Sequence, residues 1–175
     1  MASRFVIVTG LPASGKSTAG AAVAAALALP FLDKDEILEA LFESLGVGDA
    51  PWRARLSRAA DQVLQRLALG SQGAVIASWW RHPRSPVSSG TSPDWLRSLP
   101  GELIELHCRC SPQVAAERFF ARRRHAGHLD AAKSKAEELA RFEQFASHGA
   151  LGIGRVVEID TEQELDLPAL LDQIA

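Results

Sequence analysis

The chain of 175 residues has few cysteines, which limits the covalent and metal chemistry open to it. The two that it has, Cys108 and Cys110, stand one residue apart in a strand-like run, so they share a sheet face and do not form a redox C-x-x-C motif. His107 precedes them, but no second pair of ligands follows, and the pattern favours reduced cysteines over a zinc site. A chain of this length buries a sizeable core without disulfides or metals.

The sequence also lacks a strong charge imbalance and a long apolar run. The formal net charge is −2, so no global basic field attracts nucleic acid or a membrane surface. No apolar run approaches the ~20 residues of a membrane span, and no signal-peptide pattern precedes the first predicted strand. Without a fixed-period repeat, we expect one domain over residues 1–175, cytoplasmic and either monomeric or homodimeric.

A glycine-rich stretch near the start is the most informative feature of the chain. Residues 10–17 read GLPASGKS and match the phosphate-binding pattern G-x-x-x-x-G-K-[ST]. The apolar run over residues 5–9 predicts a buried strand before it, and the Ala- and Leu-rich run over residues 18–29 predicts a helix after it. We therefore expect a P-loop that binds ATP through Gly10, Pro12, Ala13, Ser14, Gly15, Lys16, Ser17 and Thr18.

Phosphate chemistry explains these residue types. Gly10 and Gly15 have access to backbone angles closed to other residues and let the main chain approach the phosphates. The N–H groups at the start of the helix then face the anion. The ammonium of Lys16 is predicted to contact the β- and γ-phosphates during catalysis, and the Ser17 hydroxyl to ligate Mg²⁺.

Two carboxylates follow a second predicted strand, residues 30–32. We interpret Asp35 as the base or orienting group for a substrate hydroxyl, and Asp33 as a support for Mg²⁺ through water. A third predicted strand, residues 74–77, ends without the aspartate of a Walker-B strand, which favours Asp33 on the metal side. The structural alternative is that Asp33 caps a helix and Asp35 is a favourable acid in its first turn.

Helices and strands alternate along the rest of the chain. Residues 103–108 and 156–159 are further predicted strands. Apolar spacing and turn residues predict helices over 37–45, 52–69, 93–99 and 111–124, one opened by the capping box Ser134-x-x-Glu137, and a terminal one capped by Thr161-x-x-Glu164. This alternation predicts an α/β fold with a parallel sheet covered on both faces and a ligand site beyond the carboxyl ends of its strands.

The chain resembles the small P-loop kinases typified by gluconate kinase, shikimate kinase and chloramphenicol phosphotransferase. The resemblance covers nearly the whole chain and rests on GLPASGKS, on D-x-D after the second strand, on S-P-x-x-x-x-x-R from Ser111 to Arg118, and on VVEIDT at residues 156–161. It implies a P-loop NTPase fold with a five-stranded parallel sheet, helices on both faces and a mobile Arg-rich lid at approximately residues 118–135. It also implies transfer of the γ-phosphoryl group of ATP to a small-molecule hydroxyl.

The same resemblance gives roles to the arginines of the lid. Arg118 would lie beside the adenine or the phosphates, and Arg122 or Arg124 would neutralise charge during phosphoryl transfer. The alternative for each is a solvated basic helix face. We expect His125 and His128 on the lid surface rather than at a metal.

The acceptor is the least defined part of the prediction. By helical spacing Arg53 faces the sheet, where its guanidinium suits a carboxylate or a polyol. Trp79, Trp80 and Arg81 open a Ser/Pro/Gly-rich segment and are predicted to hold an aromatic or sugar ring, with core filling as the alternative for the tryptophans. We expect a sugar-like or natural-product acceptor, and antibiotic resistance is one role that this would serve.

Two other functional classes stay open at this point. One is a nucleoside, nucleotide or polynucleotide-end kinase, of which the net charge disfavours the last. The other is a regulatory P-loop NTPase in which hydrolysis switches a conformation. The fold alone does not decide among these functions.

Overall fold

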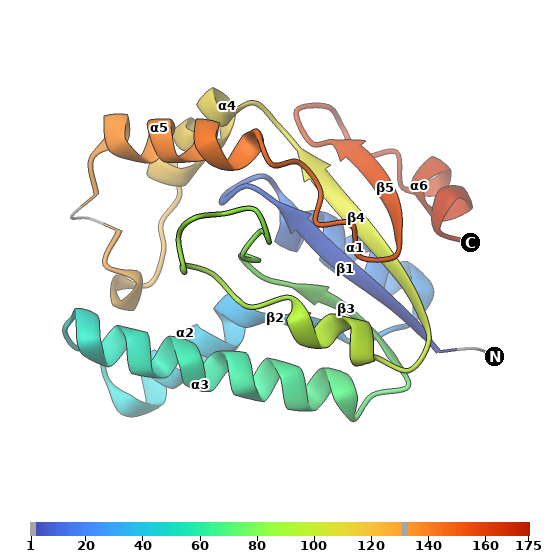
Figure 1. The fold of residues 1–175 in the computed structure, drawn as a ribbon, viewed down its shortest axis with the longest axis horizontal. Helices are drawn as coiled ribbons and strands as arrows, with labels where there is room; N and C mark the ends of the chain where they lie inside the picture. Colours follow the sequence, from blue (N-terminus) through green and yellow to red (C-terminus); the bar gives the residue numbers. More distant parts are fainter. Residues whose placement is uncertain (1–2, 131–132) are drawn as a thin grey trace.

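A five-stranded sheet forms the centre of the computed structural model, which describes residues 3–130 and 133–175 (Figure 1). The strands pair in the order β2-β3-β1-β4-β5, and each of these pairings is parallel. The elements are β1 (Arg4–Gly10), α1 (Lys16–Leu27), β2 (Phe31–Asp33), α2 (Lys34–Leu45), α3 (Ala50–Leu69), β3 (Gly73–Ala77), the 3₁₀ turn η1 (Asp94–Ser98), β4 (Glu102–Arg109), α4 (Pro112–Ala121), the 3₁₀ turn η2 (Ala126–His128), α5 (Lys135–Ala146), β5 (Arg155–Asp160) and α6 (Leu167–Ile174).

The apolar sequence of β1 explains why this strand is central. Val6 and Val8 pack into the core on the face covered by α1 and α6, and Phe5 and Ile7 pack into the core that includes α3. All four side chains are fully buried, and burial of such a side chain contributes roughly 1.5–3 kcal/mol. A strand that is apolar on both faces has to lie inside a sheet covered on both sides. The predicted α/β P-loop NTPase fold, with helices on both faces, is therefore confirmed.

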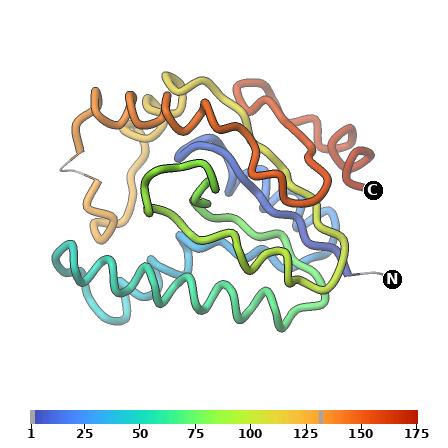
Figure 2. Tube along the Cα trace, viewed as in Figure 1, coloured from blue at the N-terminus to red at the C-terminus, as the bar shows by residue number. Residues whose placement is uncertain are grey.

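Loops rather than a helix cover part of the sheet on the α3 side. Figure 2 shows segments 79–91 (green) and 147–154 (orange to red) crossing the same face. They are joined where the His82 ring donates from Nε2 to the carbonyl of Ala150, at 3.1 Å. The area under these loops is therefore closed by turns and side chains from two distant parts of the chain.

Two predicted helix starts and one predicted capping hydrogen bond differ from the structure. Helix α3 begins at Ala50 rather than residue 52, because the Asp49 side chain caps it by accepting from the Trp52 N–H at 2.9 Å. The capping box at Thr161-x-x-Glu164 is wrong, since Asp166 caps α6. Ser134 does occupy the N-cap position of α5, but its side chain makes no capping hydrogen bond.

The cysteines are free, in agreement with the sequence. Cys108 is buried in β4, and burial raises the pKa of its thiol to about 12, so it behaves as an apolar core residue. Cys110 lies just beyond the end of β4. Within the described residues, no helix combines the length and the apolar character needed to cross a membrane.

One strand residue, Glu105, is charged and yet has no exposed surface. Its two carboxylate oxygens accept from the backbone N–H groups of Leu151, Gly152 and Ile153 at 2.7–3.0 Å. The Thr9 hydroxyl adds a fourth hydrogen bond at 2.7 Å. Four donors satisfy the buried group and hold the loop before β5 against the sheet.

We predict that Glu105→Gln lowers the free energy of unfolding by about 2–4 kcal/mol, because an amide nitrogen would face backbone donors that need an acceptor. The measurement is urea denaturation. Glu102→Gln on the same strand is the matched control, since Glu102 only pairs with Arg4 and Arg155 at the surface, and its loss should cost below about 1 kcal/mol. Equal effects of the two substitutions would contradict the assignment.

Candidate active site

The turn between β1 and α1 has the backbone geometry of an anion site. Gly10 has φ 133°, and a Cβ there would lie 2.3 Å from the carbonyl oxygen of Cys108. Gly15 precedes α1 with φ 85°, and no side chain caps this helix. The first N–H groups of α1 are thus left without a side-chain partner, at the end of the helix where the dipole favours an anion.

Lys16 lies folded back over this turn. Its ammonium donates to the carbonyl oxygens of Leu11 at 2.5 Å and Gly10 at 3.2 Å. Burial lowers the pKa of Lys16, against the opposing effect of Asp33, Asp35 and Cys108. The Ser14 hydroxyl, within the described part of the chain, is buried without a hydrogen-bond partner. The turn therefore offers a cation and a buried polar group that a phosphate would satisfy.

Asp33 connects the P-loop to the second strand. It accepts from the Ser17 hydroxyl through Oδ2 at 2.6 Å and from the Asp35 backbone N–H through Oδ1 at 2.9 Å. Asp33 therefore caps α2, as the structural alternative requires, and its other carboxylate oxygen contacts Ser17, the predicted Mg²⁺ ligand. Burial raises the pKa of Asp33, and its two hydrogen bonds oppose this shift.

The residues present fit Mg²⁺ as P-loop proteins hold it. The described residues contain no cluster of three or more His, Cys, Asp or Glu side chains that would bind a metal alone. Mg²⁺ bound to a nucleotide needs only one or two protein ligands, because phosphates and waters complete its shell. Ser17 and Asp33 are the residues that would hold it here, with Ser17 as ligand and Asp33 acting through water.

Asp35 forms an ion pair with the predicted lid. Arg124 donates to Asp35 Oδ2 at 2.5 Å and to Asp130 at 3.0 Å, so its guanidinium bridges two carboxylates. Asp35 remains half exposed, whereas the Arg124 side chain is 15% exposed. Burial alone would raise the pKa of Asp130, but Lys133 and Arg124 hold that pKa below its usual range. The segment after α4 is thus attached to the start of α2.

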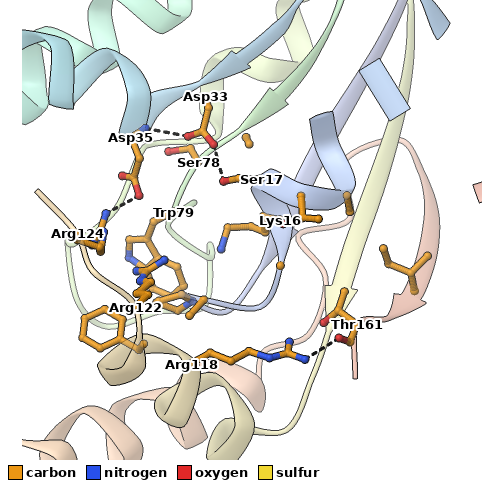
Figure 3. Close-up of a pocket in the computed structure, with 18 of the residues that line it drawn as sticks. Lys16, Ser17, Asp33, Asp35, Ser78, Trp79, Arg118, Arg122, Arg124 and Thr161 are labelled. Atoms are coloured by element: carbon orange, nitrogen blue, oxygen red, sulfur yellow. Dashed lines mark hydrogen bonds and ion pairs between the residues drawn. The ribbon is translucent and has the colours of Figure 1, made fainter. Parts of the chain in front are cut away.

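One cavity of about 580 Å³ brings these groups together (Figure 3). At one end Arg118 donates to the carbonyl of Thr161 at 2.9 Å, and at the other Arg124 meets Asp35, with Lys16 between them. Burial and the neighbouring Arg124 lower the pKa of Arg122, which also lines the cavity. Among the predicted nucleotide-binding residues, Pro12, Ala13, Gly15, Lys16, Ser17, Thr18 and Arg118 line this cavity, whereas Gly10 and Ser14 do not.

Comparison with known proteins agrees with this geometry. Residues 5–78, from β1 to the end of β3, match the model of the AAA domain family. The structure is similar to a "putative kinase" from Chloroflexus aurantiacus, with a TM-score of 0.80 and 27% identity over 99% of this chain and 97% of that one. The chain has a P-loop kinase fold. The fold implies nucleotide binding, and the predicted resemblance to the small P-loop kinases is confirmed.

More distant solved structures share the P-loop kinase fold. A shikimate kinase from Bacteroides thetaiotaomicron has a TM-score of 0.58 and 18% identity, over 99% of this chain and 95% of that one. A gluconokinase from Sinorhizobium meliloti 1021 has a TM-score of 0.50 and 20% identity, over 97% of this chain and 87% of that one. A search of curated proteins gives no match.

The predicted acceptor residues divide into two groups. Arg53 and Trp79 line the large cavity of the P-loop kinase fold. Trp80 does not: it is 5% exposed, packs in the core on the α3 side, and donates from its indole nitrogen to the Val8 carbonyl at 3.0 Å. Arg81 also lies outside this cavity, and its backbone N–H donates to the Thr91 carbonyl at 2.9 Å. Assigning Trp80 and Arg81 to the acceptor site is therefore not supported by the geometry.

The prediction that His125 and His128 lie on the surface of the lid also needs a correction. His128 is 1% exposed and pairs with Glu39 of α2 at 2.8 Å. Phe42 stacks on His125 at 5.4 Å between ring centroids, and a Cβ on Gly127 would lie 2.4 Å from the Phe42 ring. Burial lowers the pKa of His128, which favours the neutral ring. Residues 126–128 are thus packed on α2, and residues 131 and 132 of the predicted lid lie outside the described residues.

A buried polar network behind the cavity was missed by sequence reasoning. Lys34, between the two predicted site aspartates, is buried and pairs with Asp61 of α3 at 2.7 Å. Thr91 donates to Asp61 at 2.7 Å, accepts from Lys34 at 3.1 Å, and lies 2.6 Å from the Ser78 hydroxyl. No local pattern signals these contacts, because they join residues 13 to 57 positions apart. The network fixes α2, α3 and the end of β3 relative to one another.

We predict that Lys34→Met lowers the free energy of unfolding by about 1–3 kcal/mol, because it leaves Asp61 without its cation in a partly buried place. Urea denaturation of Lys34→Met, Asp61→Asn and the double variant should give a coupling of about 0.5–3 kcal/mol. Lys135→Met, at an exposed position of α5, is the matched control and should change little. Additive effects at positions 34 and 61 would contradict the network.

Proposed function

We propose that this chain is an ATP-dependent phosphotransferase that moves the γ-phosphoryl group to a hydroxyl of a small sugar-like or natural-product substrate. The observation that supports it is one cavity lined by an anion-binding turn, two carboxylates and several cations from distant elements. Phosphoryl transfer requires this combination, because catalysis consists of positioning the reactants and neutralising charge on the transferred group. A cavity of about 580 Å³ is also of the size that ligand sites usually have.

Asp35 is the group that would receive the acceptor. Its Oδ2 is held by Arg124, and within the described residues Oδ1 makes no hydrogen bond, so Oδ1 is free to accept from a substrate hydroxyl. Lys16 would contact the β- and γ-phosphates after exchanging its hydrogen bonds to the Gly10 and Leu11 carbonyls for phosphate oxygens. Bound ATP with Mg²⁺ supplies the phosphoryl group and the electrophilic metal in this arrangement.

The acceptor side of the cavity is defined by Arg53 and Trp79. The Nε of Arg53 is buried without a hydrogen-bond partner in the described part of the chain, so a ligand acceptor would satisfy it. Trp79 packs against Phe145 with ring centroids 4.7 Å apart and presents an aromatic wall. A polyol or a carboxylate next to a ring fits these two side chains, which favours a sugar-like or natural-product acceptor, antibiotics among them.

The lid is part of the same proposal. Arg122 and Arg124 would neutralise the transferred group, and Arg118 would contact the nucleotide from the Thr161 side. Arg124 would exchange Asp35 for phosphate oxygens when the nucleotide and the acceptor are bound. We propose that residues 1–175 act as one domain, cytoplasmic and either monomeric or dimeric.

The test of the function is a coupled assay of ADP release against sugars, sugar acids, nucleosides and antibiotics. We predict that at least one hydroxylated compound stimulates release, and that Lys16→Ala abolishes the stimulation. Asp35→Asn should lower turnover by about 10² to 10⁴ with little change in ATP affinity, because the acceptor of the hydroxyl proton is lost. Stimulation by a nucleoside alone would indicate a nucleoside kinase. Release that no compound stimulates, with Asp35→Asn equal to the parent, would refute phosphoryl transfer to a hydroxyl.

Asp33→Asn separates the metal role from the capping role. Asparagine caps a helix as well as aspartate does, so the cap on Asp35 N–H and the thermal stability should persist. The Mg²⁺ concentration for half-maximal rate should rise, because the charge next to the metal's water shell is lost. An unchanged Mg²⁺ requirement would assign Asp33 to capping alone.

The packing of the lid predicts an uneven exchange pattern. Hydrogen exchange should be fast at residues 123 and 124, whose N–H groups have no hydrogen-bond partner among the described residues, and slow at residues 127 and 128, which are buried against α2 and donate their N–H groups to His125. Adding a non-hydrolysable ATP analogue with Mg²⁺ should slow exchange at residues 123 and 124, because Arg122 and Arg124 find phosphate partners. ADP without Mg²⁺ is the control. Unchanged exchange in a demonstrated complex with the analogue would exclude a closing lid.

A further inference from the structure

A second cavity, of about 280 Å³, lies on the other side of the P-loop and has no part in the proposed phosphoryl transfer. Trp79 lines both cavities, whereas Gly10 and Leu11 line only the second one. It is lined by residues at the carboxyl ends of β1 and β4 and by residues of segments 79–91 and 147–154. Its floor is formed by side chains on the sheet face that is opposite α1.

A sheet face that is covered by loops usually carries apolar side chains, but the floor of this cavity is polar. Thr9 and His107 are neighbours in the register of β1 and β4, and Glu105 shares their face. Thr9 Oγ1 lies 2.7 Å from Glu105 Oε1 and 2.8 Å from His107 Nδ1. The three side chains thus form a hydrogen-bonded row from a fully buried carboxylate to a half-buried imidazole.

This row fixes the tautomer of His107. The Glu105 carboxylate accepts from three backbone N–H groups and has no proton to donate. In its fourth hydrogen bond the Thr9 hydroxyl is therefore the donor and uses its single proton. The Thr9 oxygen must then accept from Nδ1–H of His107. Burial lowers the pKa of His107, which favours the neutral ring. A neutral ring protonated at Nδ1 presents Nε2 as a hydrogen-bond acceptor, and this nitrogen has no partner within the described residues.

The walls of the cavity are aromatic and its rim is cationic. His82 and His148 stack with ring centroids 5.0 Å apart and an interplanar angle of 16°. Trp79 and Phe145 form a second aromatic pair. Arg81 adds a guanidinium that makes no ion pair within the described residues, and Glu158, a carboxylate of the same lining, pairs with Arg109 at 3.1 Å. A volume of about 280 Å³ is slightly below the range of drug-sized sites, so a single ring system fits.

We propose that this cavity is a second binding site, for a small planar heteroaromatic molecule that donates a hydrogen bond to His107 Nε2 and carries an anionic group for Arg81. The aromatic pairs supply flat apolar contact surfaces. The imidazole would accept a hydrogen bond from an N–H or O–H group, and the guanidinium would form an ion pair with a carboxylate or a similar anion. Trp79 borders both cavities, whereas His107, Arg81, His82 and His148 line only this one and take no part in the proposed phosphoryl transfer.

Titration calorimetry with orotate, uracil and benzoate tests each element of the proposal. Orotate has a ring N–H and a carboxylate, uracil lacks the carboxylate, and benzoate lacks the N–H. We expect orotate to bind with a Kd below about 1 mM, and the other two at least tenfold more weakly, because each loses one of the two polar contacts (about 1.4 kcal/mol per tenfold). If orotate does not bind at 10 mM, its binding free energy is no more favourable than roughly −2.7 kcal/mol, and the proposal is overturned.

Three variants place the ligand in one cavity or the other. Arg81 is partly exposed, and Arg81→Gln should weaken the binding of orotate at least tenfold and leave the binding of uracil unchanged. His107→Leu should weaken the binding of both compounds. Arg53→Gln removes a guanidinium from the large cavity and is the matched control, with no expected effect. If Arg53→Gln weakens orotate and Arg81→Gln does not, the ligand lies in the large cavity and the second site is refuted. Arg81→Gln decides the outcome should His107→Leu fail to fold.

Discussion

The register of β1 between β3 and β4 determines where every group of the large cavity lies. Val8 is level with Ala77, and Asp33 of β2 is level with the same residue. The ends of three strands therefore meet at one height, as the parallel arrangement requires. From there the Gly10 turn carries the chain into α1, and the Ser17 hydroxyl arrives 2.6 Å from Asp33. A shift of one residue in the pairing of β2 with β3 would turn Asp33 to the other face of the sheet and break its contact with Ser17.

Ion pairs between distant elements stand at the edge of the large cavity and behind it. Arg124 bridges Asp35 and Asp130, and Lys34 meets Asp61 behind them. Such pairs are costly to desolvate, and their stabilising effect depends on how completely each partner is matched. They do hold α2, α3 and the segment after α4 in fixed relative positions. Asp33 and Asp35 therefore rest on a polar scaffold rather than on apolar packing alone.

The sequence predicts those parts of the molecule that depend on local patterns. The P-loop, the order of strands and helices, and Asp33 at the end of β2 follow from spacing and residue type, and the fold confirms them. Trp80 is different, because its role as a core residue depends on a hydrogen bond to Val8, which lies on another strand.

Contacts over long sequence separations explain the other differences. The partners of Lys34 and His128 lie on other elements, and only the folded chain brings them together. The capping box at Thr161 failed because the terminal helix starts later, where Asp166 provides a better placed acceptor. Residue type alone does not show which of two capping signals the chain uses.

The contact of Gly127 with Phe42 has a mechanical consequence. Between α4 and α5, residues 126–128 are held against α2 by the Phe42 ring, which leaves no room for a Cβ on Gly127. Arg122 and Arg124 therefore sit on a short strap with both ends tethered. We expect a strap held at both ends to reorient through a few backbone angles, with a smaller displacement than a segment with a free end. The travel of the two guanidinium groups is accordingly short, and tilting α2 would reposition them.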